Sequence, residues 1–182
     1  MFGKENDNEQ KYKNAALIAL LVYVLCLFWV VILKCNLRSA IIDSRIFMSK
    51  MTLLERVIYS VGRFAKSNTP DILVNIIIFL PIGLLFPFII KNNTYFLSAI
   101  SGTAISFAVE LAQLLIPIGC FTYIDIFTNS LGAFIGVMVH YLLRNVTEER
   151  MQVFALRVSS AVAAMTVIFA TVKTIQNIDI YL

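Results

Sequence analysis

The chain has 182 residues, and 59% of them are hydrophobic, a share well above that of ordinary soluble domains. Its net charge of +4 comes from basic residues beside apolar runs, which favours membrane anchoring and argues against nucleic-acid binding. The three cysteines follow no spacing typical of disulfides or metal sites, and no motif indicates a cofactor. These properties predict an all-α membrane protein without metal or cofactor.

Five apolar segments are long enough to cross a bilayer, which takes about 20 helical residues. They cover residues 15–33, 72–90, 95–116, 121–143 and 152–172, and a polar tail at residues 1–14 precedes them. We expect the first span to be retained, because no strong signal-peptide cleavage site follows it. The prediction is a single domain over residues 15–182, a polytopic bundle of about five transmembrane helices.

The segment 35–70 differs from the spans because it is rich in Lys and Arg. Apolar residues recur in it at helical spacing, at Leu54, Val57, Ile58, Val61 and Phe64. Thr52 and Glu55 have the spacing of a capping box, which would begin this helix. A basic amphipathic helix fits best on the membrane surface. The same residues also fit a solvated connector that contains a short helix.

Polar residues stand inside three of the apolar spans. With five spans, the segment 35–70 and the loop between the third and fourth spans lie on side B, opposite the amino-terminal side A. Counted at 1.5 Å per residue, five polar side chains lie about 6 to 12 Å from side B: Asn75, Glu110, Gln113, Asp125 and Asn129. A carboxylate that faces lipid is costly, so we expect these groups to line a polar pocket open to side B.

The spacing of these residues places them on two helical faces. The third span presents Ser106, Glu110 and Gln113 on one side. The fourth span presents a stripe that begins with two polar residues and continues with two glycines, Asp125, Asn129, Gly132 and Gly136. Small residues let a neighbouring helix approach closely, so the glycines favour helix packing over a direct functional role.

Plainer interpretations are open for most of the polar residues. Asn75 and Asn129 also fit hydrogen bonds that join two helices. Asp125 also fits a capping box with Thr122 at the start of the fourth span. Glu110 has no such ordinary explanation, and an intramembrane carboxylate is a functional candidate by default.

The charges of the short loops indicate the orientation of the chain. Lys91, Arg144 and Arg150 lie in loops on side A, whereas the loop between the third and fourth spans carries no charge. The positive-inside rule therefore predicts a cytoplasmic amino terminus and a pocket on the outer side, although the basic segment 35–70 argues the other way. His140 lies toward side A, where we expect it at the membrane interface.

Three stretches of the sequence resemble motifs of the VanZ-like membrane proteins. Residues 75–83 (NIIIFLPIG) resemble N-x-x-x-F-x-P-x-G, residues 109–113 (VELAQ) resemble x-E-x-x-Q, and residues 125–136 (DIFTNSLGAFIG) resemble D-x-x-x-N-x-x-G-x-x-x-G. The order and spacing of the three agree over residues 71–143. Many members carry an Arg and an acidic pair before the last stretch, where this chain has GCFTYID at residues 119–125, with one acid and no Arg.

The resemblance implies low-level resistance to teicoplanin and related glycopeptides, the property of the family's namesake. One hypothesis is a membrane binding factor, surrounded by membrane lipids, whose pocket engages a lipid-linked cell-wall precursor or a lipoglycopeptide at the outer leaflet. The alternative is an intramembrane enzyme that uses Glu110 and Asp125 as acid and base on a phospholipid or polyprenyl-linked substrate. No nucleophile–base pair or phosphate-binding glycine loop accompanies these carboxylates, which favours the binding factor. Transport and a structural role stay open.

Overall fold

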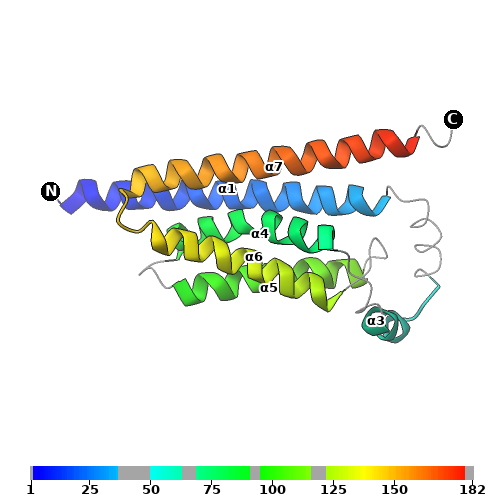
Figure 1. Ribbon diagram of the computed structural model, residues 1–182. Helices are drawn as coiled ribbons and strands as arrows, with labels where there is room; N and C mark the ends of the chain where they lie inside the picture. The colour runs from blue at the N-terminus through cyan, green and yellow to red at the C-terminus, as the bar shows by residue number, and fades with distance from the viewer. Residues whose placement is uncertain (1, 37–49, 63–68, 91–94, 116–121, 179–182) are drawn as a thin grey trace.

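The structure, a computed structural model, describes residues 2–36, 50–62, 69–90, 95–115 and 122–178. Within these ranges the chain is all-helical, with α1 (Phe2–Asn36), α3 (Leu53–Gly62), α4 (Thr69–Ile89), α5 (Tyr95–Leu115), α6 (Tyr123–Leu142) and α7 (Glu148–Ile178). All helices but α3 run along one common axis, and α3 is seen end-on at one end of the bundle (Figure 1). The predicted all-α bundle is therefore confirmed.

Among the described residues, four helices are long and apolar enough to cross a membrane, at Gln10–Phe28, Ile72–Ile89, Tyr95–Leu115 and Glu148–Ile168. These correspond to four of the five expected spans. The remaining one is α6, which has 20 residues but carries Asp125, Asn129 and His140, so that it is less apolar than the others. α1 begins at Phe2. Residues 2–14 of the expected polar tail are therefore helical and form the first part of α1.

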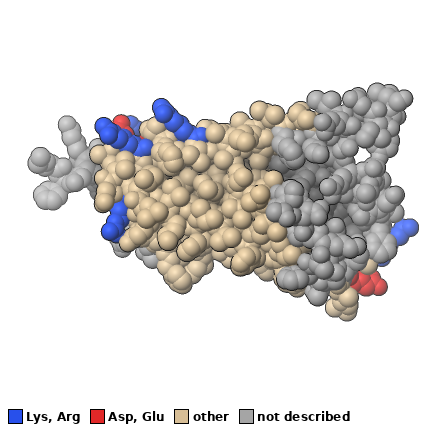
Figure 2. Space-filling view, viewed as in Figure 1, with Lys and Arg blue, Asp and Glu red and all other residues tan. Residues whose placement is uncertain are grey.

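The described surface of the bundle is apolar along its length. Large side chains such as Leu25, Phe96 and Phe127 are exposed. Figure 2 shows an uncharged band over the middle of the bundle, with Lys and Arg gathered at the end where α1 begins. A soluble protein does not expose so much contiguous apolar surface, whereas a bilayer covers it. This distribution is that of a membrane helix bundle.

α4 lies at the centre of the bundle, where it packs against α1, α5, α6 and α7. Its residues Leu84 and Leu85 are completely buried, because neighbouring helices cover α4 on several sides. Pro81 lacks the N–H that would close a hydrogen bond within this helix. Close to that break, the Tyr23 hydroxyl of α1 donates to the Ile78 carbonyl at 2.6 Å. This bond ties α1 to α4 beside the proline.

Glycines bring α4 and α6 into contact along their backbones. A Cβ atom at Gly132 would overlap the backbone of Ile76, and one at Gly136 would overlap the carbonyl of Leu80. Gly83 of α4 is equally close to the backbone of α6. The two glycines of the α6 stripe therefore lie in the α4–α6 contact. The polar residues of the same stripe must consequently point toward α4 as well.

α3 begins at the capping box that the sequence predicts. The Thr52 N–H donates to the Glu55 carboxylate at 2.7 Å, and the Glu55 N–H donates to the Thr52 hydroxyl at 3.4 Å. Leu54 and Ile58 are exposed, as expected of a helix whose apolar side faces the membrane interface. The remainder of the basic segment lies largely outside the described residues.

Candidate functional site

The amino terminus of α6 is where the polar residues of three helices meet. Thr122 caps this helix, because its hydroxyl accepts a hydrogen bond from the Asp125 N–H at 3.2 Å. In a complete capping box, the Asp125 carboxylate would accept the Thr122 N–H in return. Here the Thr122 N–H donates instead to the Glu110 carboxylate of α5, at 3.1 Å. Half of the expected box forms, and the Asp125 carboxylate is available to another helix.

That other helix is α4, which contributes Asn75. The amide of Asn75 donates to the Asp125 carboxylate at 2.7 Å and to the Thr128 hydroxyl at 3.2 Å. A continuous chain of hydrogen bonds thus leads from α5, through the cap of α6, to α4. We call this group the polar junction, and its five members are Asn75, Glu110, Thr122, Asp125 and Thr128.

The members of the polar junction differ in how deeply they are buried. Glu110 is 2% exposed and Thr128 is 3% exposed, whereas Asn75 and Asp125 are half-buried. A carboxylate can be buried in an apolar bundle only when hydrogen bonds replace its hydration, and Thr122 provides one such bond to Glu110. The junction lies at side B, where α5 ends and α4 and α6 begin (Figure 1).

Ser106 extends the buried polar surface from the same face of α5. It lies one turn before Glu110, is completely buried, and its hydroxyl donates to the Ile126 carbonyl of α6 at 3.4 Å. The face of the third span that carries Ser106 and Glu110 therefore packs against α6. This contact fixes the rotation of α5 and keeps Glu110 directed at the start of α6.

Two of the residues that the sequence singles out stand apart from this chain of hydrogen bonds. Gln113 is half-buried, and its side chain forms no hydrogen bond with a described residue. Asn129 is only 4% exposed and likewise forms none within the described ranges. The interhelical hydrogen bond expected of an asparagine is therefore seen at Asn75.

His140 occupies a place that the sequence did not indicate. The side chain is buried inside the bundle, with its Nδ1 atom 3.2 Å from the Leu84 carbonyl of α4 and its ring 4.7 Å from that of Phe88. It lies in the last turn of α6, and its depth at the membrane interface stays a prediction. Its position four residues after Gly136, on the stripe that faces α4, is the signal that could have placed it.

Arg56 of α3 is a second residue that the sequence did not single out. Its guanidinium donates to the Leu114 carbonyl at 3.1 Å and to the Leu115 carbonyl at 3.4 Å, at the carboxyl end of α5. The end of a helix carries partial negative charge and unpaired carbonyls, so an arginine stabilises it. No local pattern can reveal this contact, because the partners are 58 residues apart.

The chemistry of the polar junction is that of hydrogen bonding. Two carboxylates, two threonine hydroxyls and an amide offer donors and acceptors suited to hydroxyl and amide groups of a ligand. Among the described residues, no group of three His, Cys, Asp or Glu side chains could hold a metal ion.

The comparisons with known proteins concern the part of the sequence that forms the polar junction. The VanZ/LLP1 family model matches residues 20–144, which include α4, α5, α6 and the whole polar junction. Protein VanZ of Enterococcus faecium is 26% identical over 132 residues, which are 72% of this chain and 76% of that protein. No solved structure matches the chain. Because the family model covers well over half of its residues, the chain belongs to the VanZ/LLP1 family.

Proposed function

We propose that this chain contributes to resistance against glycopeptides of the teicoplanin type, as a multi-pass protein of the cell membrane. In this proposal the polar junction, with Gln113 and Asn129 beside it, binds a lipid-linked cell-envelope molecule or the drug itself. Family membership supports the class of function. The observation that carries the proposal is the chain of hydrogen bonds that joins Glu110, Thr122, Asp125 and Asn75 across three otherwise apolar helices.

The partial exposure of the polar junction supports a binding role. A network that served only to hold helices together could be fully enclosed, but Asn75 and Asp125 remain half-exposed at side B. Deeper in the bundle, Asn129 adds a buried amide. A ligand entering from the bilayer surface would meet charged and amide groups first and a buried amide next. Sugar hydroxyls and peptide groups have the matching chemistry.

Orientation is part of the proposal. The described arginines of the side-A loop region, Arg144 and Arg150, are exposed at the end where α1 begins. Under the positive-inside rule this end is cytoplasmic, which places the polar junction at the outer leaflet. In the proposal, the lipid-linked molecule or the drug therefore reaches the polar junction from that leaflet.

A second candidate, an intramembrane acid–base enzyme, is favoured by one observation. The Glu110 carboxylate accepts the Thr122 N–H, and the Asp125 backbone N–H donates to the Thr122 hydroxyl, so two acidic residues border one capping residue. An acid and a base beside the same residue could transfer protons to and from a bound phospholipid or polyprenyl-linked substrate. The two candidate functions differ in whether the Glu110 carboxyl group must gain and lose a proton.

Substitutions at Glu110 separate the candidates. Cells lacking the gene would be complemented with wild type, Glu110→Gln or Glu110→Ala, and the minimum inhibitory concentrations of teicoplanin and other envelope-directed drugs would be compared. Gln can still accept the Thr122 N–H, so the binding proposal expects it to keep resistance, whereas Ala should lose it. Thr103→Ala is the control, because its exposed hydroxyl bonds only to its own helix. Amounts of inserted, folded protein are measured for all variants.

Two other outcomes would change the conclusion. If both Glu110 variants lose resistance while remaining folded in the membrane, titration of this group is required and the enzyme is favoured. If both keep full resistance, the polar junction is not the site. Orientation is tested in a variant without native cysteines, by labelling Lys50→Cys at side B and Asn145→Cys at side A with a reagent that does not cross membranes. Reaction of the second alone in intact cells would overturn the proposed topology.

A further inference from the structure

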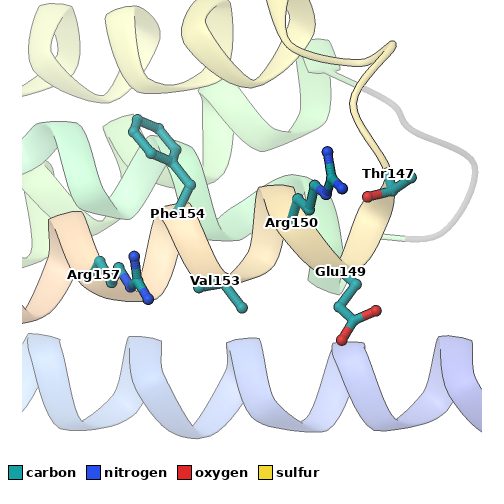
Figure 3. Close-up of a pocket in the computed structure, with 6 residues that line it drawn as sticks. All are labelled: Thr147, Glu149, Arg150, Val153, Phe154 and Arg157. Carbon is teal, nitrogen blue, oxygen red and sulfur yellow. The ribbon is translucent and has the colours of Figure 1, made fainter.

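A cleft on the amino-terminal part of α7 lies away from the polar junction, at the opposite end of the bundle. It has a volume of about 470 Å³, and six residues line it: Thr147, Glu149, Arg150, Val153, Phe154 and Arg157 (Figure 3). All six come from the start of α7 and the residue before it. The family match ends at residue 144, so the whole cleft lies outside the matched part of the chain.

The two arginines of the cleft are placed to act on one ligand. Seven residues separate Arg150 from Arg157, which puts them on one face of the helix, about 10 Å apart along its axis. Both side chains are exposed, and neither forms an ion pair with any residue in the described ranges. Guanidinium groups bind phosphate oxygens through paired hydrogen bonds. Their flexible stems can bring both groups toward a phosphate placed between them.

Apolar side chains lie between the two arginines. Val153 and Phe154 are 42% and 41% exposed, and both line the cleft. The exposed side of α7 remains apolar beyond the cleft, at Met165 and Ile168. A small soluble anion would need only the arginines. A molecule with a phosphate at one end and hydrocarbon chains at the other would use both the charged and the apolar residues.

The charge of the cleft selects among such molecules. Two arginines and Glu149 give the lining residues a net charge of +1, which a single negative phosphodiester neutralises. A zwitterionic lipid would leave this positive charge unmatched. The Glu149 carboxylate and the Thr147 hydroxyl can also accept hydrogen bonds from headgroup hydroxyls.

We propose that the cleft binds the headgroup of a singly negative glycerophospholipid, from the leaflet at the end where α1 begins. Arg150 and Arg157 hold the phosphodiester, and an acyl chain lies along α7 past Val153 and Phe154. The residues of the cleft belong to the start of α7, which lies at the end where α1 begins (Figure 1). Lys and Arg gather at this end beside the uncharged band (Figure 2), as expected near the depth of lipid headgroups. This site is independent of the polar junction.

Native mass spectrometry of the full-length protein in detergent tests this proposal. Phosphatidylglycerol and phosphatidylcholine with identical chains are added at equal concentrations, and bound lipid is counted. We expect wild type to retain more phosphatidylglycerol, and each arginine replaced by Gln to weaken this binding about fivefold. Arg144→Gln is the matched control, because it removes the same charge at the same end, from a guanidinium 4.6 Å above the Tyr141 ring.

A variant that is expected to bind more lipid distinguishes a specific loss of lipid binding from misfolding. Glu149→Gln raises the charge of the cleft and should increase phosphatidylglycerol binding, which a destabilised protein would not do. The proposal fails if the arginine variants lose no more lipid than Arg144→Gln, or if Glu149→Gln does not bind more lipid. It also fails if both lipids bind equally. Displacement by millimolar inorganic phosphate would show that the cleft binds a free anion rather than a lipid.

Discussion

The contact between α4 and α6 differs in kind from the contact between α1 and α7. α4 and α6 touch through their backbones at Gly83, Gly132 and Gly136, and polar side chains join them at both ends of the contact. α1 and α7 pack through side chains, with Leu20 and Met151 among those that are buried. Within the described residues, one side-chain hydrogen bond joins that pair, from Gln152 to the Tyr12 carbonyl at 2.6 Å.

This difference separates a rigid part of the molecule from an adaptable one. Side chains between two helices can change rotamer when one of them is altered, whereas two backbones in contact cannot move without separating the helices. Close backbone contact also places Asn75 within reach of Asp125, because neither side chain is long. The part of the chain that the family model matches contains all of the α4–α6 contact but none of α7.

The largest effect is expected from Gly132→Ala. The new methyl group would overlap the Ile76 backbone, so α4 and α6 must move apart and the polar junction must break. Overpacking of this kind costs about 1–3 kcal/mol, and loss of the junction adds to it. The folded fraction remaining after heating in detergent, followed by size-exclusion chromatography, measures the loss. Ala155→Val, at a completely buried residue of α7, a helix that packs against α1 and α4, should lower the melting temperature less. An equal loss would contradict the distinction between backbone contact and side-chain packing.

Gly102→Ala offers a sharper form of the same test. A Cβ atom at Gly102 would lie 2.5 Å from the Cβ atom of Ala133, a side-chain atom that substitution can remove. We therefore expect Ala133→Gly to restore most of the stability that Gly102→Ala loses. No side-chain substitution should rescue Gly132→Ala, since its obstacle is backbone. Thermal stability of the single and double variants checks both statements.

A smaller effect is expected when the hydrogen bond between Asn75 and Asp125 is removed. Hydrogen bonds between membrane helices contribute about 0.6 kcal/mol on average and up to about 1.7 kcal/mol. A double-mutant cycle with Asn75→Ala and Asp125→Ala should give a coupling energy in the upper part of this range, because the distance is 2.7 Å. Unfolding in detergent measures it, and strictly additive losses would mean that the two side chains do not interact.

Gln152→Ala tests the contact between α1 and α7, which is the more adaptable of the two contacts. It removes the hydrogen bond to the Tyr12 carbonyl, but the apolar contacts of α1 and α7 remain. We expect a loss below about 1 kcal/mol and an unchanged polar junction. Hydrogen exchange should rise near Tyr12 and stay constant at the start of α6. Increased exchange in α6 would show that the two contacts are coupled.

The smallest effect concerns α3, which lies outside both contacts. Hydrogen bonds from the Thr52 backbone and then from its side chain lower the pKa of Glu55. The ionised carboxylate therefore stabilises the start of α3 at pH values above its ordinary pKa, and this contribution is lost as the pH falls through the lowered value. Amide exchange over residues 53–62, corrected for its intrinsic pH dependence, should rise on acidification in wild type. Glu55→Gln should show no such transition.

Much of the candidate site could be predicted from periodicity alone. The spacing of Glu110 with Ser106, and of Asp125 with Gly132, places each group on one helical face and sets its depth in the bundle. The route of the hydrogen bonds could not be predicted. Asp125 and Thr122 fit a complete capping box, and only the position of α5 shows that Glu110 takes the Thr122 N–H instead.

The sequence by itself determined the all-helical membrane fold, the approximate spans and the set of polar residues near side B. These follow from hydrophobicity and helical periodicity, which are local properties of the chain. Tertiary structure alone decided that Arg56 caps α5, and that Gln113 and Asn129 stand apart from the chain of hydrogen bonds. The physical reason is that hydrogen-bond partners are chosen by the packing and rotation of whole helices, which residues distant in sequence fix together.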